Sequence, residues 1–175
     1  MKEYFTLDES LAFLNKDIDK KERISVEDLF LFAARGNIKP CFYYCGDLLW
    51  REEREQYNYM KGYIEHNFTG YLSHRNLGEY LHNSYKDDIR LFFIKFAHIY
   101  EPVGATVIPD DKTTVVLYDA LFHDCSMEIK YNQLSEDRKR EQNLCAFSFL
   151  EIGPACIHFD KVFFHKKELL KLKGV

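Results

Sequence analysis

The sequence lacks the patterns that mark several large classes of protein. It has no apolar run of the length that crosses a bilayer, about 18 residues or more, and no basic start followed by a short apolar stretch. We therefore expect no membrane contact and a cytoplasmic location, in a bacterial host cell. The net charge of −4 argues against an extended phosphate-binding surface, although it leaves room for a local basic patch.

Signatures of catalysis and of metal binding are also missing. There is no P-loop, GxGxxG, HExxH or GxSxG pattern. The five cysteines are odd in number and lie among apolar or aromatic residues, which indicates free thiols; Cys41 and Cys45 lack a second pair of ligands at zinc spacing. His123 and Cys125 hint at a base and a nucleophile, but the two positions need not touch. We predict no catalytic residue, no metal and no cofactor, so the protein is not expected to be an enzyme. A hydrolase or nuclease that uses loop acids and histidines is the weakest alternative.

Aromatic residues are abundant instead. Twelve tyrosines and 15 phenylalanines favour β-structure, and the apolar content is high enough for a folded core. Tyr57, Tyr59 and Tyr63 recur in a stretch that predicts strands. Tyrosines in such a place pack in the sheet or anchor a protein interface.

The clearest local signals stand at the beginning. Thr6 with Glu9 forms a capping box before an apolar stripe, which predicts a helix over residues 7–14. Ser25 with Asp28 repeats the pattern before a second helix, and Gly36 marks its end. The charged residues 15–23 between them predict a solvated loop.

The rest of the chain predicts mostly strands. We expect a strand at residues 41–44 with a turn at 45–47, two strands within 57–71 interrupted near 65–67, and a short helix at 76–82. Residues 89–100 favour one long strand, although their length also fits a helix. Further strands are expected at 105–108, 113–121, 127–131, 145–150 and 156–164, a polar helix or loop at 135–142, and a final helix at 166–173.

These features carry a family resemblance. Residues 6–14, 26–29 and 34–38 resemble the opening of small winged-helix proteins of the excisionase type, relatives of the MerR group. The whole pattern, including residues 157–169 near the end, is similar to that of uncharacterised accessory proteins of phages and prophages. The resemblance implies an α+β protein with a helix-turn-helix-like module (residues 1–48) packed on an antiparallel β-rich region (residues 49–175), either as two units or as one.

The second predicted helix departs from DNA-reading helices in its side chains. It offers Glu27, Asp28 and Phe30 where base-reading helices carry basic or amide residues, and only Arg35 near its end is basic. We therefore predict a protein partner, contacted by these four residues together with Tyr57, Tyr59 and Tyr63. We expect that inhibition of a host defence complex is one form of such binding.

A DNA-binding regulator or excisionase-like factor is the alternative. Its contacts would come from Arg35 and from the lysines Lys39, Lys161, Lys166 and Lys167. The lysines near the end also fit the solvated side of a final amphipathic helix, where they complement the helix dipole. The sequence names neither the partner nor the oligomeric state.

Overall fold

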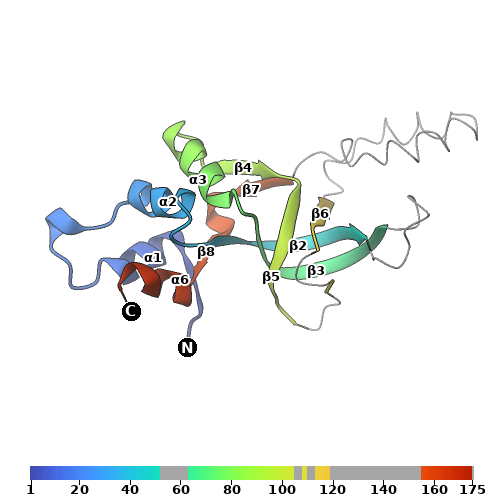
Figure 1. Cartoon of the computed structure of the whole chain (residues 1–175), viewed down its shortest axis with the longest axis horizontal. Helices are drawn as coiled ribbons and strands as arrows, with labels where there is room; N and C mark the ends of the chain where they lie inside the picture. The colour runs from blue at the N-terminus through green and yellow to red at the C-terminus, as the bar shows by residue number, and fades with distance from the viewer. Residues whose placement is uncertain (52–62, 105–107, 110–112, 119–154, 175) are drawn as a thin grey trace, which may run out of the picture.

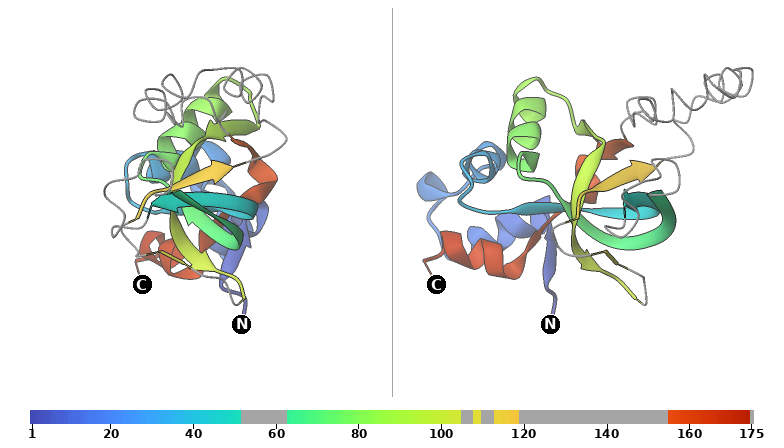
Figure 2. Two further views of the ribbon diagram at one scale, coloured as in Figure 1. Left: turned by 90° about the vertical axis from the view of Figure 1, so that its right-hand side faces the viewer. Right: turned by 45° about the vertical axis from the view of Figure 1, so that its right-hand side comes forward.

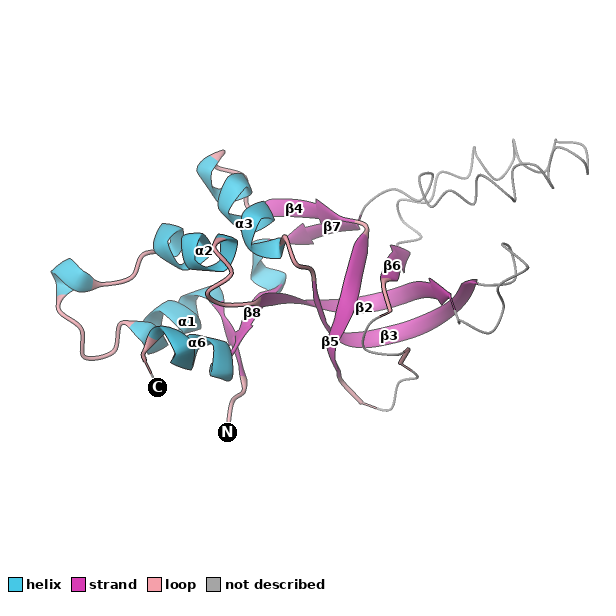
Figure 3. Ribbon diagram, viewed as in Figure 1, coloured by secondary structure: helices cyan, strands magenta, loops and turns pink. Residues whose placement is uncertain are grey.

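The computed structural model describes residues 1–51, 63–104, 108–109, 113–118 and 155–174, and it is a mixed α+β protein (Figure 1). The helices are α1 (Leu7–Leu14), α2 (Val26–Ala34), α3 (Leu77–Lys86) and α6 (Lys166–Leu172). The strands are β1 (Tyr4–Thr6), β2 (Pro40–Arg51), β3 (Tyr63–Ser73), β4 (Leu91–Ile94), β5 (Phe96–Pro102), β6 (Val115–Tyr118), β7 (Ala155–His158) and β8 (Val162–His165). Helices gather at one end, and β2 and β3 run side by side away from them (Figure 3).

A small antiparallel barrel forms the β-rich end. β2 pairs with β3, β3 with β5, β5 with β6, and β6 returns to β2, so these four strands close on themselves. Apolar residues of all four strands are buried, among them Leu48, Trp50, Phe68, Leu72, Ala97, Val115 and Leu117. Each of these described strands thus has a hydrogen-bonded neighbour on both sides within the ring (Figure 2).

The two ends of the chain meet in the same sheet. β8 pairs with the first residues of β2, where Pro40 lies opposite Phe164, and β1 pairs with β8, where Tyr4 lies opposite His165. β2 runs without a break across residue 48, and buried residues of the helices and of the barrel belong to one core. The N-terminal helices therefore pack as one unit with the β-rich region.

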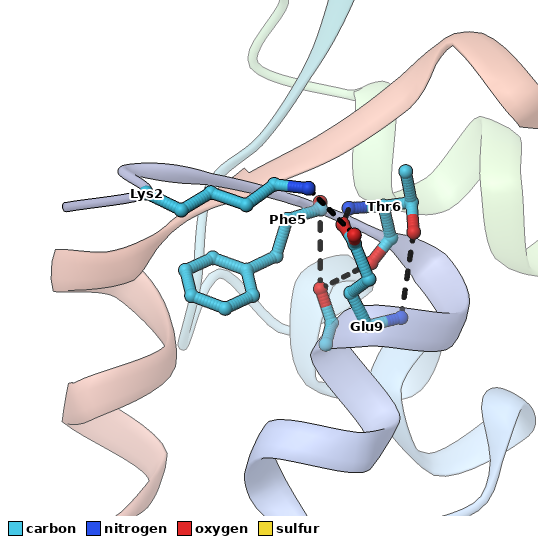
Figure 4. Close-up of polar contacts among 5 residues, drawn as sticks. Lys2, Phe5, Thr6 and Glu9 are labelled. Atoms are coloured by element: carbon cyan, nitrogen blue, oxygen red, sulfur yellow. Dashed lines mark hydrogen bonds and ion pairs between the residues drawn. The ribbon is translucent and has the colours of Figure 1, made fainter.

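Both predicted capping boxes are confirmed. Thr6 N–H donates to Glu9 Oε2 at 2.9 Å and Glu9 N–H donates to Thr6 Oγ1 at 3.4 Å, while Lys2 pairs with the same carboxylate (Figure 4). Ser25 and Asp28 make the equivalent bonds at the start of α2, and Gly36 ends that helix at a φ of +76°. These caps satisfy backbone groups that a helix end leaves free.

The main partner of α2 is a helix distant in sequence. α2 packs chiefly against α3 and only slightly against α1, and the strand after α2 joins the barrel. Gly78 makes this approach possible, since a Cβ at that position would come within 2.3 Å of the carbonyl carbon and oxygen of Ala33. The fold is thus α+β, with α2 and α3 in close contact and α1 and α6 beside β8.

Several predicted boundaries are wrong. The turn at 45–47 is absent because β2 continues through Gly46, over which the ring of Tyr44 folds. The interruption at 65–67 is absent because β3 keeps its register with β2 throughout. The single strand at 89–100 is two strands of different sheets, β4 and β5, which meet at Lys95; the strand at 156–164 is likewise split by a 3-10 turn (Phe159–Lys161).

Other predicted elements are confirmed, and some fall outside the residues that the structure describes. The helix expected at 76–82 is α3, which extends to Lys86, and the final helix is α6. β6 confirms part of the strand expected at 113–121. The elements expected at 127–131, 135–142 and 145–150 lie outside the described residues, as do most of 51–62 and 105–108.

We predict that Gly78→Ala lowers the free energy of unfolding by about 2 kcal/mol or more, because the added methyl group forces α3 away from α2. Urea denaturation followed by circular dichroism measures this change. Glu79→Ala, at the exposed neighbouring position of the same helix, is the control and should change stability by less than about 0.5 kcal/mol. Equal effects of the two substitutions would contradict the role of the close contact.

Candidate functional site

Aromatic side chains from five strands meet on one face of the sheet. We call this set the tyrosine face; it consists of Tyr4 (β1), Tyr43 (β2), Tyr71 (β3), Tyr100 (β5) and Phe163 and His165 (β8), all partly exposed. Tyr43 lies opposite Tyr71 in the register of β2 and β3, and the next pair, Phe42 and Leu72, is fully buried in the core. Because successive side chains point to opposite sides of a strand, the tyrosine face lies on the side away from that core pair.

The stack of Tyr4 on Tyr71 defines the shape of this face. The two ring centroids lie 3.7 Å apart and the rings are within 5° of parallel. Two strands, β8 and β2, separate β1 from β3, so a flat sheet would hold these residues about 14 Å apart. The sheet therefore curls until its edge strand touches β3. Tyr43 and Phe163 each meet the Tyr71 ring edge-on, with centroids at 5.6 and 5.5 Å.

Polar groups hold the edge strand in place. The Tyr4 hydroxyl donates a hydrogen bond to the Glu101 carboxylate of β5. The Lys166 N–H donates to the Glu3 carbonyl at 2.7 Å, and His165 Nε2 lies 3.7 Å from a Glu3 carboxylate oxygen. His165 Nδ1 accepts the N–H of Lys167 at 3.1 Å and so caps α6. β1 is thus fixed by ring stacking, by a carboxylate and by the start of the last helix.

Three tyrosines of this face and the Cys41 thiol of β2 have pKa values above their ordinary values. Burial, followed by the hydrogen bond to Glu101, raises the pKa of Tyr4 well above its ordinary value. Burial also raises the pKa of Tyr100, of Tyr71 and of the Cys41 thiol. Nucleophilic and acid–base catalysis at neutral pH depend on the opposite kind of shift, toward 7. These four groups are therefore protonated at neutral pH.

Tyr100 differs from Tyr4 in one respect. Its hydroxyl is buried and has no hydrogen-bond partner among the described residues, although the Lys167 ammonium lies 5.1 Å from the centre of its ring. A buried hydroxyl without a partner costs free energy, because it has lost water and gained nothing in return. The two tyrosines therefore form a matched pair, one with a hydroxyl that is bonded and one with a hydroxyl that is not.

The residues predicted for partner binding are not gathered in one place. Glu27, Asp28 and Arg35 are exposed on α2, where Asp28 serves as a capping residue. Phe30 is a correction: it is fully buried and packs edge-on against Tyr85 and Phe159, so it is not part of a contact surface. Its burial follows from the α2–α3 contact, which makes this side of α2 a core face.

Only some of the remaining predicted residues lie in the part of the chain that the structure describes. Tyr63 begins β3 opposite Arg51, whereas Tyr57 and Tyr59 lie outside the described residues. Lys161 and Lys39 are exposed, and the Lys39 N–H donates to the buried Glu168 carboxylate at 2.9 Å. The two remaining lysines of the predicted set, Lys166 and Lys167, start α6 beside the tyrosine face.

Sequence reasoning missed Tyr4, Tyr43 and Tyr100 as members of one site. Successive side chains of a strand point to opposite sides, so a strand pattern indicates which residues share a side within that strand. Strand order and curl decide which faces meet, and neither is written in the local pattern. In the part of the chain that the structure describes, no three histidine, cysteine or acidic side chains gather as metal ligands, and Cys41, Cys45 and Cys156 are free thiols.

We predict that Tyr4→Phe and Tyr100→Phe have different effects on stability. Tyr4→Phe should lower the free energy of unfolding by about 1 kcal/mol, because the bond to Glu101 is lost. Tyr100→Phe should leave stability unchanged or raise it by up to about 1 kcal/mol, since the hydroxyl that it removes has no partner. Chemical denaturation of the two variants provides the comparison, and a larger loss in Tyr100→Phe would refute it.

We also predict that the protein loses stability in alkaline solution. The raised pKa values of Tyr4, Tyr71 and Tyr100 mean that the unfolded chain gives up these protons more readily than the folded chain does. The stabilising effect is complete below the ordinary tyrosine pKa, about 10, and declines as the pH rises through and above it. Unfolding free energies measured from about pH 8 to pH 11 should fall less steeply in Tyr4→Phe than in the wild type. If the unfolding free energies of the two proteins fell equally steeply with pH, Tyr4 would not contribute to the loss of stability in alkaline solution.

Comparisons with protein-family models, with curated proteins and with solved structures gave no match for this chain. Within the described residues, none of the helices combines the length and the apolar character that crossing a bilayer requires.

Proposed function

We propose that this protein works by binding another protein and that the tyrosine face is its contact surface. The observation that carries the proposal is the convergence of aromatic side chains from five strands at positions that remain partly exposed. Tyrosine is enriched at the centres of protein interfaces, because its ring offers a large rigid contact area and its hydroxyl adds a hydrogen bond.

Rigidity and charge support the same proposal. The Tyr4–Tyr71 stack and the bond from Tyr4 to Glu101 fix the rings before a partner arrives, which lowers the entropy cost of binding. Glu101 and Lys167 are exposed charges of opposite sign beside the rings. An apolar centre with a charged rim is the usual arrangement of a protein interface.

The sequence resemblance suggests the setting of this binding. An accessory protein of a phage or prophage would contact a protein of the host or of the phage, and inhibition of a host defence complex is one form of such contact. We propose a non-enzymatic role of this kind. The finer resemblance, to a winged-helix module of excisionase type, stays a prediction.

The alternative is a DNA-binding regulator, and α2 gives it little support. Its first turn exposes Glu27 and Asp28, which phosphate would repel, and Phe30 is turned into the core. Arg35, Lys39, Lys161 and Lys167 are exposed basic residues, and together with the partly exposed Lys166 they are the remaining basis for DNA contact. We therefore rank protein binding first.

A photo-cross-linking residue at position 43 tests the proposed surface. We expect the full chain, incubated in a lysate of the cells that produce it, to form a discrete cross-linked product at position 43 and none at position 80, a tyrosine of α3 that packs on His74. A companion variant, Tyr71→Ser with the same cross-linker, should lose at least about 90% of the product, since removal of a central aromatic anchor costs about 2 kcal/mol or more.

Two results would count against the proposal. Equal labelling from positions 43 and 80 would mean that the tyrosine face has no special role. A shift of random-sequence duplex DNA at low salt that disappears as salt is raised would favour the regulator instead. Circular dichroism of each variant shows that a lost product reflects the surface and not unfolding.

A further inference from the structure

β4 is an apolar strand that is paired on one side. It has no charged residue and no proline, and among the described strands it pairs with β7 alone. Phe92 and Ile94 are buried, whereas the Phe93 side chain is 58% exposed. An unpaired strand edge presents N–H and C=O groups in a row, and natural proteins usually protect such an edge with charge, proline or a covering element.

Positive charge at the end of this strand lacks a counter-charge. Lys95 follows β4 directly, and no carboxylate of the described residues forms an ion pair with it. Its ammonium lies 5.9 Å from the ring centre of Phe96, which is 42% exposed, and partial burial lowers the pKa of Lys95. At the other end, Arg90 is already balanced by Asp88 at 3.1 Å.

We propose that the edge of β4 that no described strand occupies accepts an extended segment of a partner protein by strand addition, and that this segment is apolar with a carboxylate where it meets Lys95. Main-chain hydrogen bonds would supply affinity, and alternate apolar side chains would cover Phe93. The carboxylate follows from charge complementarity, since a partly desolvated cation without a counter-charge favours an anion over a second cation.

A peptide fits this place better than a nucleic acid does. The strand edge offers peptide donors and acceptors in strand register, which match another backbone and not a row of phosphates. Beside β4, Lys95 is the only basic residue that forms no ion pair with a described residue, since Arg90 pairs with Asp88. A single-stranded nucleic acid is instead held by a groove with many positive charges along its backbone. This surface is separate from the tyrosine face, so either proposal can fail alone.

Synthetic peptides test the inference directly. The probe is a short fluorescent peptide of alternating valine and threonine with aspartates at both ends, titrated with the full chain and followed by anisotropy. We expect it to bind more tightly than the same peptide with lysines at its ends. Methylation of alternate backbone nitrogens should abolish binding, because it removes the donors that pair with β4.

Matched variants locate the effect. Lys95→Glu should weaken binding of the acidic peptide by roughly tenfold and reverse the preference between the two peptides. Phe93→Ser should weaken both peptides, whereas Lys16→Glu, in the exposed loop before α2, should change neither. No binding, equal binding of the methylated peptide, or indifference to Lys95→Glu would overturn the proposal. Tighter, Phe93-dependent binding of an oligothymidine would overturn it in favour of a nucleic acid.

Discussion

The arrangement of the sheet depends on β2, because this strand forms hydrogen bonds with three other strands. Its first residues bond to β8, its later residues bond to β6, and almost its whole length bonds to β3. The first contact ties in the two ends of the chain, and the second closes the barrel. A β2 that ended at a turn after four residues would lose the barrel, so its continuation through Gly46 determines the architecture. The tyrosine face is a consequence, because curling around β2 brings β1 to β3.

Local signals in the sequence predicted what depends on local chemistry. The capping boxes of Thr6 and Ser25, the helix end at Gly36 and the helix after Asn76 are all set by bonds between residues a few positions apart. The strand boundaries depend on distant partners and were harder to predict. Gly46 suggested a turn, yet the ring of Tyr44 covers it and β3 pairs with it. Lys95 gave no sign that β4 and β5 belong to different sheets.

The candidate site shows the same division. Phe30 was assigned to a contact surface because it stands where base-reading helices carry polar side chains, but it is buried where α2 packs against α3. Lys166 and Lys167 were placed correctly on the last helix, but the approach of Lys167 to Tyr100 and of the Lys166 N–H to the Glu3 carbonyl required the fold. The tyrosines of β1, β2 and β5 are separated by dozens of residues, and only strand order brings them together. Hydrophobic alternation reveals a face without revealing its neighbours.

The pairing of β1 with β8 also has a consequence for biosynthesis. β1 leaves the ribosome long before β8 does, and until β8 follows, the backbone groups of β1 lack the strand with which they pair. Helices α1 and α2 can begin to form early, since the bonds that cap them are local, but the curled sheet is completed only after β8 has been made. Synthesis thus leaves a long interval in which aromatic strands are exposed. The tyrosine face comes into existence in the last moments of folding.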